Sequence, residues 1–351
     1  MAAYKQTAQA HHDGLVDLSI GTPVDPTPAV VQRALRAASD APGYPLTAGT
    51  SALRESIADW LARRLGVTGL QPAAVLPTVG SKELVALLPT LLGLGPGDLV
   101  VHPELAYPTY DVGARIAGAE PVPADSLTAL GPARVRLLWL NSPANPTGRV
   151  LPAAHLRKVV AWARERGAVV ASDECYIELG WDEEPVSVLH PDVCDGDHTG
   201  LLAVHSLSKR SNLAGYRAGF VAGDPALVRR VLSIRRHAGL IVPAPVQAAM
   251  TAAYADEEHV AEQRERYARR RGNLLAALRA FGLRIEHSTA GLYLWATADE
   301  DCWATVTRLA RLGVLVAPGE FYGPAGRRHI RVSLTATDER IAAAMERLST
   351  G

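Results

Sequence analysis

Short apolar segments alternate with helix-like segments along the first two-thirds of the chain, and this alternation limits the fold more than any other feature. The apolar runs cover residues 75–79, 98–102, 135–140, 168–172 and 201–205, and turn residues bound them. Runs of this length without polar alternation are typical of strands buried on both faces. Because helical segments lie between them, the sequence predicts an α/β fold with a mainly parallel sheet.

The expected helices cover residues 28–39, 51–65, 155–166 and 257–278, and another begins at Lys82. Thr27 is a candidate N-cap for the first of them, with Pro28 at the first helical position. In the second, apolar residues recur on one face, namely Leu53, Ile57, Trp60 and Leu61. Three later apolar runs, 292–296, 313–317 and 329–334, predict a second, smaller sheet.

The length of 351 residues exceeds the roughly 250–300 at which a single hydrophobic core stops growing. We therefore expect a large domain over residues 44–242. A smaller α+β domain would consist of residues 1–43 and 243–351. The proposed boundary lies at the proline-rich segment 243–245.

Charge and cysteine content exclude several classes of function. The chain has 36 Lys and Arg against 36 Asp and Glu, so its overall charge gives no attraction to nucleic acid or anionic membranes. No apolar segment is long enough to cross a bilayer, and residues 1–14 lack the apolar core of a signal peptide. Cys175, Cys194 and Cys302 have no metal-ligand spacing. We expect a cytoplasmic protein without a metal site.

The segment HSLSKRSNLAGYRAGF, residues 205–220, is the most specific in the chain. Lys209 follows the end of a predicted strand, and it is one of only four lysines. A lysine amine can form a Schiff base with an aldehyde cofactor. Ser206, Ser208 and Arg217 could hold that cofactor's phosphate. The alternatives are an exposed loop lysine or a Ser-x-x-Lys nucleophile, but the latter needs a later Lys-Thr-Gly element that the sequence lacks.

Two further motifs directly follow predicted strands. Asp173 and Tyr176 come after the strand VVAS, where α/β sheets bind ligands. A carboxylate there could keep a pyridine nitrogen protonated, and a phenol could hydrogen-bond a ring oxygen. Asn145 lies in NSPANPTG after the strand RLLWL, and its amide could donate to an oxygen anion. The alternatives are a helix N-cap aspartate and an ordinary Asn-Pro turn.

A glycine turn and an aromatic residue complete the set. Gly80, Ser81 and Lys82 form a strand-to-helix turn, where free backbone N–H groups can bind phosphate. The alternative is an N-cap serine. Tyr107, in LAYPTY, could stack on a flat ring or be a core aromatic. The conjunction of all four motifs, each after a strand, is more specific than any one of them.

With these motifs in this order, the chain resembles the fold-type I, pyridoxal-phosphate-dependent aminotransferases of classes I and II, over about residues 16–348. The resemblance implies an aspartate-aminotransferase-like fold, in which a mainly parallel seven-stranded sheet lies between helices and a smaller α+β domain is added. It also implies pyridoxal 5'-phosphate as cofactor. A homodimer with shared active sites and amino acid and 2-oxo acid substrates are implied as well.

The same resemblance assigns roles to individual residues. Lys209 would be the Schiff-base lysine and proton shuttle, Asp173 the partner of the pyridine nitrogen, and Tyr107 the stacking aromatic. Asn145 and Tyr176 would bind the ring oxygen. The remaining assignments are a phosphate cup of Gly80, Ser81, Lys82, Ser206, Ser208 and Arg217, a substrate-carboxylate arginine at Arg331, a closing loop at Ile20 and Gly21, and a phosphate-binding tyrosine from the partner subunit at Tyr44.

Longer stretches, such as GYPLTAGTSALRESI and AVHSLSKRSNLAGYRAGFVAGDPALV, resemble the actinobacterial N-succinyl-diaminopimelate aminotransferases of lysine biosynthesis. This implies glutamate as donor, with 2-oxoglutarate as its product, and a succinylated oxopimelate as acceptor. Other acceptors, aromatic or aspartate-like, would keep the same residues, as would a β-lyase. A non-catalytic module that only binds the cofactor is a further alternative. Arg235, Arg236 and His237 are candidates for the distal acidic group, or else surface charges on a helix.

Overall fold

The fold is built on a seven-stranded sheet with the order β2-β8-β7-β6-β5-β3-β4. The structure is a computed structural model that describes residues 1–132 and 134–350. Strands β3 to β7 are parallel, whereas β8 runs antiparallel to both β2 and β7. The strands are β2 (Val75–Val79), β3 (Leu99–His102), β4 (Glu120–Pro123), β5 (Val135–Asn141), β6 (Val169–Asp173), β7 (Leu201–Ser206) and β8 (Ala218–Gly223).

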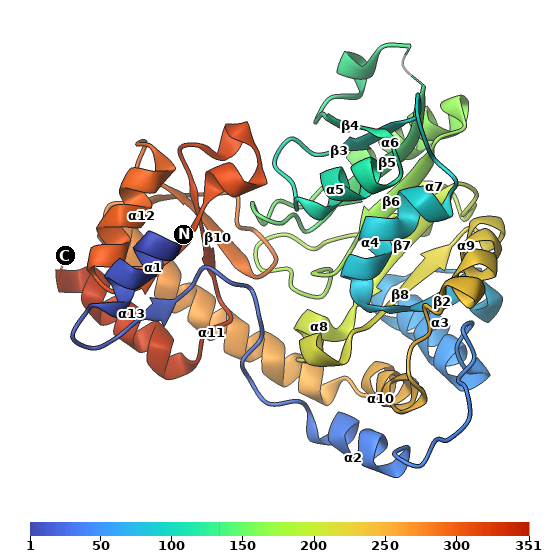
Figure 1. Cartoon of the computed structure of the whole chain (residues 1–351), viewed down its shortest axis with the longest axis horizontal. Coiled ribbons are helices and arrows are strands. Elements are labelled where there is room, and N and C mark those ends of the chain that lie inside the picture. The colour runs from blue at the N-terminus through green and yellow to red at the C-terminus, as the bar shows by residue number, and fades with distance from the viewer. Residues whose placement is uncertain (133, 351) are drawn as a thin grey trace.

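Helices cover both faces of this sheet, which confirms the predicted α/β class (Figure 1). Along β5, Leu138 and Leu140 face one hydrophobic cluster, and Leu137 and Trp139 face the other. The first cluster includes residues of α3 (Ser51–Leu65), α6 (Ala153–Arg166), α7 (Pro191–Cys194) and α10 (Ala244–Ala255). The second includes residues of α4 (Gly80–Leu91), α5 (Thr109–Ile116) and α9 (Pro225–Ala238).

All five predicted strands of this sheet are confirmed, and two strands were not predicted. β4 contains Pro121 and Pro123, which interrupt an apolar run and are tolerated because β4 lies at the sheet edge. β8, with the sequence AGFVAG, is rich in glycine. A Cβ on Gly219 would lie 2.9 Å from the His205 carbonyl oxygen, so close backbone packing explains that composition.

Helix boundaries follow the sequence with two corrections. α3 begins and ends where predicted, and the Thr50 side chain accepts a hydrogen bond from Leu53 N. Thr27 does not cap α2 (Ala29–Ala37), because Pro28 itself occupies the N-cap position in an extended conformation. α4 begins at Gly80 rather than Lys82, since the positive φ of Gly80 turns the chain directly from strand into helix.

A second group of elements packs around a four-stranded sheet with the order β12-β13-β10-β9. Its strands are β9 (Arg284–Glu286), β10 (Tyr293–Thr297), β12 (Ala317–Pro318) and β13 (Ile330–Ser333). The predicted strand 313–317 is divided in the structure. Its middle part, β11 (Val314–Leu315), pairs with β1 (Val16–Asp17), and only its last residue, in β12, joins the four-stranded sheet. The helices are α1 (Ala2–Gln9), α11 (Glu258–Ala280), α12 (Cys302–Arg311) and α13 (Asp338–Thr350).

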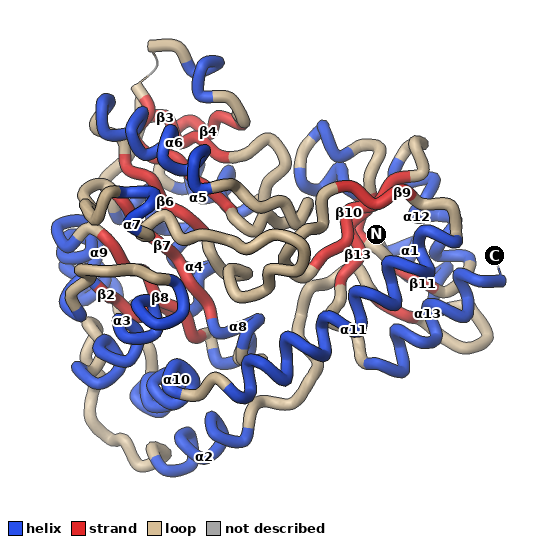
Figure 2. Tube along the Cα trace, turned by 180° about the vertical axis from the view of Figure 1, so that it is seen from behind, coloured by secondary structure: helices blue, strands red, loops and turns tan. Residues whose placement is uncertain are grey.

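Figures 1 and 2 show α11 extending from the side of α10 to this smaller sheet. Helices α1 and α13 both lie with the smaller sheet, at the left of Figure 1. Val31 of α2 and Met250 of α10 pack in the cluster of the large sheet. The division at residues 43/44 and 242/243 stays a prediction, and these two helices, which it assigns to the small domain, pack with the large one.

Short elements connect these parts. They are α8 (Leu207–Arg210) and the 3₁₀ turns η1 (Pro72–Ala74), η2 (Leu127–Leu130), η3 (Ala214–Tyr216), η4 (Gly319–Tyr322) and η5 (Pro324–Gly326). Among the described residues, every helix is too short or too polar to cross a lipid bilayer.

Candidate active site

Three of the predicted motifs lie at one edge of the large sheet, because parallel strands end at the same edge. Asn141 ends β5 and pairs in register with Asp173, which ends β6. Ser206 ends β7 and is in register with Gly219 of the antiparallel β8. Alignment of the strand ends therefore brings together residues that lie far apart in the sequence, between positions 141 and 219.

Lys209 follows β7 on the short helix α8. Ser206 caps this helix, since its Oγ accepts a hydrogen bond from Ser208 N at 3.1 Å. The Lys209 amine is largely buried and donates a hydrogen bond to the Gly21 carbonyl oxygen. Burial lowers the pKa of Lys209, because the charged form loses solvation. Arg331 and Arg217 lower it further, against the opposing effect of Tyr293 and Cys175.

Asp173 is buried at the end of β6. Its Oδ2 accepts a hydrogen bond from the Tyr110 hydroxyl at 2.9 Å, and its Oδ1 accepts one from Cys175 N at 3.3 Å. Burial raises the pKa of Asp173, and these hydrogen bonds partly oppose the increase. A buried carboxylate of this kind is suited to pair with a cation such as a protonated ring nitrogen.

The Asn-Pro turn, residues 141–148, holds Asn145 toward the smaller sheet. The Asn141 side chain ties the turn together: its Oδ1 accepts from Asn145 N at 2.7 Å, and its Nδ2 donates to the Asp173 carbonyl oxygen at 3.0 Å. Both X-Pro bonds of the turn are cis. Arg331 Nη1 donates to Asn145 Oδ1 at 2.9 Å, so the turn meets strand β13.

Arg331 is buried on β13, and its guanidinium lies 4.0 Å from the ring centroid of Tyr293. Nη2 donates to the Ser19 carbonyl oxygen at 2.7 Å. Its Nε is buried and has no hydrogen-bond partner in the part of the chain that the structure describes. A planar donor group of this kind can bind a carboxylate in a bidentate manner.

Tyr176 and Tyr293 face each other across the site, with 3.2 Å between their hydroxyl oxygens. Burial raises the pKa of Tyr176 well above its usual range. For Tyr293 the nearby Arg331 and Lys209 outweigh the effect of burial, and its pKa is lowered. The sequence reasoning missed Tyr293, although it alternates with core residues on a predicted strand. It also missed Tyr110, which follows Tyr107 by about one helical turn.

The predicted phosphate cup is formed mainly by backbone, hydroxyl and guanidinium groups. Gly80 opens α4, and a Cβ at this position would lie 2.4 Å from Arg217 Nη2. Ser81 Oγ accepts a hydrogen bond from the Cys175 thiol at 3.3 Å. A helix N-terminus, two hydroxyl-bearing segments and an arginine fit a phosphate group. Lys82 differs, because it is exposed and its Nζ lies 5.7 Å from the Tyr107 ring centroid.

Of the remaining predicted residues, Gly21 lies inside the site, and Ile20 and Tyr44 are exposed. Gly21 is buried against Tyr293, whose hydroxyl oxygen would lie 2.1 Å from a Cβ at that position. Ile20 is 59% exposed, and its carbonyl oxygen accepts from Thr335 Oγ1 at 3.0 Å. Tyr44 is fully exposed. Within one chain the site is therefore assembled without Tyr44.

The chain is similar to known proteins in both sequence and structure. The family model described as aminotransferase class I and II matches residues 13–348. A probable aminotransferase of Mycobacterium tuberculosis is 66% identical over 99% of this chain and 84% of its own length. The 4-dedimethylamino-4-oxo-anhydrotetracycline transaminase OxyQ of Streptomyces rimosus is 63% identical over 99% of this chain and 96% of its own. A probable N-succinyldiaminopimelate aminotransferase from Thermus thermophilus has a similar structure, with a TM-score of 0.89, 31% identity and coverage of 99% and 98%.

Proposed function

Since this chain belongs to the class I and II aminotransferases, whose cofactor is pyridoxal phosphate, we propose that it transfers an amino group from an amino acid to an oxo acceptor at the site around Lys209. One observation carries this proposal. A largely buried lysine of lowered pKa and a buried aspartate follow adjacent strands of one sheet, β7 and β6, and their electrostatic neighbours include the same thiol, Cys175.

The residues present fit the cofactor. Gly80, Ser81, Ser206, Ser208 and Arg217 would hold its phosphate. Asp173 would keep a proton on the ring nitrogen, and Asn145 and Tyr176 would bind the ring oxygen, with Tyr107 against the ring. When bound, the cofactor's protonated ring withdraws electrons and stabilises negative charge at the substrate α-carbon.

Lys209 would carry the proton between the substrate α-carbon and the cofactor. Its lowered pKa increases the fraction of neutral amine near neutral pH, and a neutral amine can accept a proton. In the absence of cofactor, the hydrogen bond to the Gly21 carbonyl oxygen holds the amine in the site. The buried surroundings exclude water, which would otherwise compete for the proton.

Arg331 would bind the substrate α-carboxylate. Its partners in this structure are the Asn145 amide oxygen and the Ser19 carbonyl oxygen. A carboxylate could replace either one and could also engage the unpartnered Nε. The stacked ring of Tyr293 keeps the guanidinium plane in one orientation.

For the acceptor, we propose the succinylated 2-amino-6-oxopimelate, with glutamate as donor. The sequence stretches quoted above and the structural similarity to a probable N-succinyldiaminopimelate aminotransferase support this acceptor. Arg235 would not select its distal group, because it is fully buried and donates to Glu83 Oε1 at 2.7 Å. Arg236 and His237, on the last turn of α9, stay candidates only by chain proximity.

A polycyclic ketone is the second candidate acceptor. OxyQ, whose name specifies a 4-oxo-anhydrotetracycline, is 63% identical to nearly the full length of this chain. This identity is the observation that favours a polycyclic ketone as acceptor.

A coupled assay separates the candidates. Glutamate is supplied with each acceptor in turn, and 2-oxoglutarate is measured. The panel contains the succinylated oxopimelate, oxaloacetate, an aromatic 2-oxo acid and the 4-oxo-anhydrotetracycline. The highest kcat/KM for the succinylated compound supports the first proposal, and a value below that for the tetracycline contradicts it. Release of ammonia and pyruvate from a sulfur amino acid would instead indicate a β-lyase.

We also propose a homodimer in which Tyr44 reaches the partner's phosphate cup. The full exposure of Tyr44 and the 64% exposure of Leu46 support this surface as an interface. Light scattering should give twice the 37.3 kDa chain mass, and Tyr44→Ala should weaken cofactor retention. A fully active monomer would contradict the shared site. A cytoplasmic location stays a prediction.

A further inference from the structure

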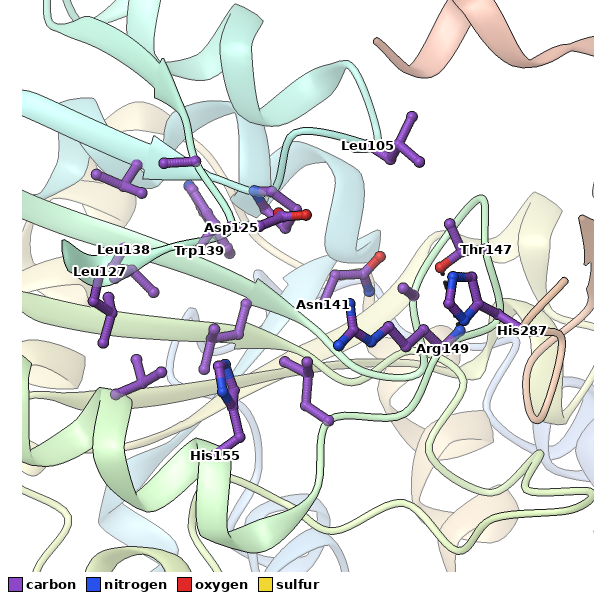
Figure 3. Close-up of a pocket in the computed structure, with 17 residues that line it drawn as sticks. Leu105, Asp125, Leu127, Leu138, Trp139, Asn141, Thr147, Arg149, His155 and His287 are labelled. Atoms are coloured by element: carbon purple, nitrogen blue, oxygen red, sulfur yellow. Dashed lines mark hydrogen bonds between the residues drawn. The ribbon is translucent and has the colours of Figure 1, made fainter. Parts of the chain in front are cut away.

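A cavity of about 200 Å³ lies beside the Asn-Pro turn, and its lining includes none of the residues predicted to bind cofactor or substrate. Figure 3 shows it between the ends of β3 and β5, the segment after β4 and the start of α6. Asn141, Ala144 and Thr147 of the turn line it, while Asn145 instead contacts Arg331. The turn therefore separates the candidate active site from a second hollow.

The wall of the cavity is apolar. Aliphatic side chains from β3, η2, β5, α6 and the segment just before α6 line it, namely Val101, Leu127, Leu138, Leu140, Leu151 and Val159. The volume exceeds the roughly 150 Å³ of an apolar cavity that binds benzene. A single aromatic ring or a short branched chain would fit.

Three nitrogen-bearing side chains also line this apolar space. Arg149, which directly follows the turn, extends toward the cavity, and His155 points toward it from α6, as Figure 3 shows. His287 lies beside Thr147. Among the described residues, no carboxylate forms an ion pair with Arg149, and its guanidinium has no hydrogen-bond partner. Its permanent positive charge is therefore available to a ligand.

The cavity lining carries little negative charge to oppose Arg149. Asp125 is the one acidic residue in the lining, and its Oδ1 accepts a hydrogen bond from Glu104 N at 3.0 Å. Burial and, next, the charge of Arg149 lower the pKa of His155, so His155 does not add a second permanent positive charge to the cavity. One arginine over an apolar wall matches one carboxylate on an apolar body. A phosphate would require more donors and would not need the apolar wall.

We propose that this cavity is a second binding site, separate from the aminotransferase centre, for a small monocarboxylate with an aromatic or branched aliphatic body. The carboxylate pairs with Arg149, and the body fills the space between Leu127 and Leu138. Because Ala144 and Thr147 line the cavity, the ligand also restricts the turn that carries Asn145.

Calorimetric titration of the holoenzyme with benzoate tests the site. Wild type should bind with a dissociation constant of about 1 mM, the order expected for so small a ligand. Arg149→Met removes the charge, and Leu127→Trp fills the space; each should weaken binding at least about tenfold. Lys158→Met is the matched control, because Lys158 is an exposed cation on the same helix as His155 but does not line the cavity. It should leave binding unchanged.

The active-site arginine must be distinguished from Arg149. Benzoate binding should survive Arg331→Lys, and benzoate should slow hydrogen exchange in residues 141–151 of wild type but not of Arg149→Met. Loss of binding in Arg331→Lys with retention in Arg149→Met would place the ligand in the active site and overturn the proposal. Absence of binding to wild type would overturn it as well. Sulfate binding as tight as that of benzoate would show that the apolar wall has no role and would exclude the proposed ligand class.

Discussion

The two sides of the candidate active site differ in how the chain builds them. On the large-sheet side, Asp173, Asn145 and Lys209 lie at or shortly after the ends of adjacent parallel strands. On the small-sheet side, Gly21 and Arg331 are more than 300 residues apart in sequence, and Ser333 N must bond the Leu18 carbonyl oxygen at 2.8 Å to join them. The first side is fixed by a continuous backbone ladder, and the second by packing between distant segments.

This contrast predicts that substitutions on the two sides change different kinetic parameters. Under the proposed function, the large-sheet side would contribute the groups that move or hold protons, so changes there should lower kcat. The small-sheet side would contribute the groups that bind the substrate carboxylate, so changes there should mainly raise KM. Each of the following substitutions tests one side of the division.

Lys209→Ala should have the largest effect, because the other lysine near the site, Lys82, is exposed and its amine lies over the Tyr107 ring. We expect kcat to fall at least about 10³-fold, since both proton transfer and the covalent bond to the cofactor are lost. Steady-state assays and the absorbance of the lysine-bound cofactor measure this. Lys158→Ala, an exposed lysine on α6, should leave both unchanged. Retained turnover in Lys209→Ala would refute the assignment of the whole large-sheet side.

Asp173→Asn should lower kcat by about 10²-fold to 10³-fold, because an amide cannot stabilise a proton on the ring nitrogen. The substitution preserves the size of the side chain, so packing against Tyr110 should persist. Asp111→Asn, on the surface of α5, is the control and should have no effect. A rise in KM with unchanged kcat would show that Asp173 belongs functionally with the binding groups and would break the division.

The same contrast explains what the sequence could predict. Strand-end residues were accessible because buried parallel strands are short apolar runs, and the residue after such a run lies at the ligand-binding edge. Asp173, Asn145 and Lys209 each follow such a run. Because the parallel strands end at the same edge, their proximity can be predicted without knowledge of the tertiary packing.

Residues placed by tertiary packing were not accessible in this way. Tyr293 is in the site because β10 lies beside β13 in register, with Trp295 opposite Arg331, and local sequence does not encode this pairing. β8 was not predicted because glycines interrupt its apolar run. Those glycines are needed where its backbone closely approaches β7 and Ser81. The predicted strand 313–317 divides because β11 pairs with β1, a partner some 300 residues earlier.

Arg331→Lys tests the small-sheet side. Lysine keeps the charge but cannot form a planar, bidentate pair with a carboxylate. Loss of one charge-assisted hydrogen bond, worth about 1.5–3 kcal/mol, should raise KM for the amino donor by about tenfold to 100-fold, with a smaller change in kcat. Arg340→Lys, at an exposed position of α13, is the control. A fall in kcat with KM unchanged would show that Arg331 acts on the reacting atoms rather than on binding.

Tyr110→Phe should have the smallest effect, and it tests the proton-holding role proposed for Asp173 on the large-sheet side. The Tyr110 hydroxyl donates to Asp173 and lowers the pKa of that carboxyl, against the increase caused by burial. Without the hydroxyl the pKa of Asp173 rises further, so the carboxyl becomes protonated and neutral at a higher pH. The reaction needs the ionised carboxylate, and therefore the acid limb of the kcat/KM profile should move upward.

The size of this shift follows from the lost hydrogen bond. A hydrogen bond to a charged group is worth about 1.5–3 kcal/mol, so its loss should move the limb upward by an amount that a pH profile resolves. At pH values well above the limb Asp173 is ionised in both proteins, and kcat/KM should agree within about threefold. Tyr254→Phe is the matched control, because Tyr254 is a buried tyrosine of the large-sheet cluster whose hydroxyl has no hydrogen-bond partner among the described residues. An unchanged acid limb in Tyr110→Phe would mean that Asp173 does not set it, and the proton-holding role of the large-sheet side would then have to lie with another group.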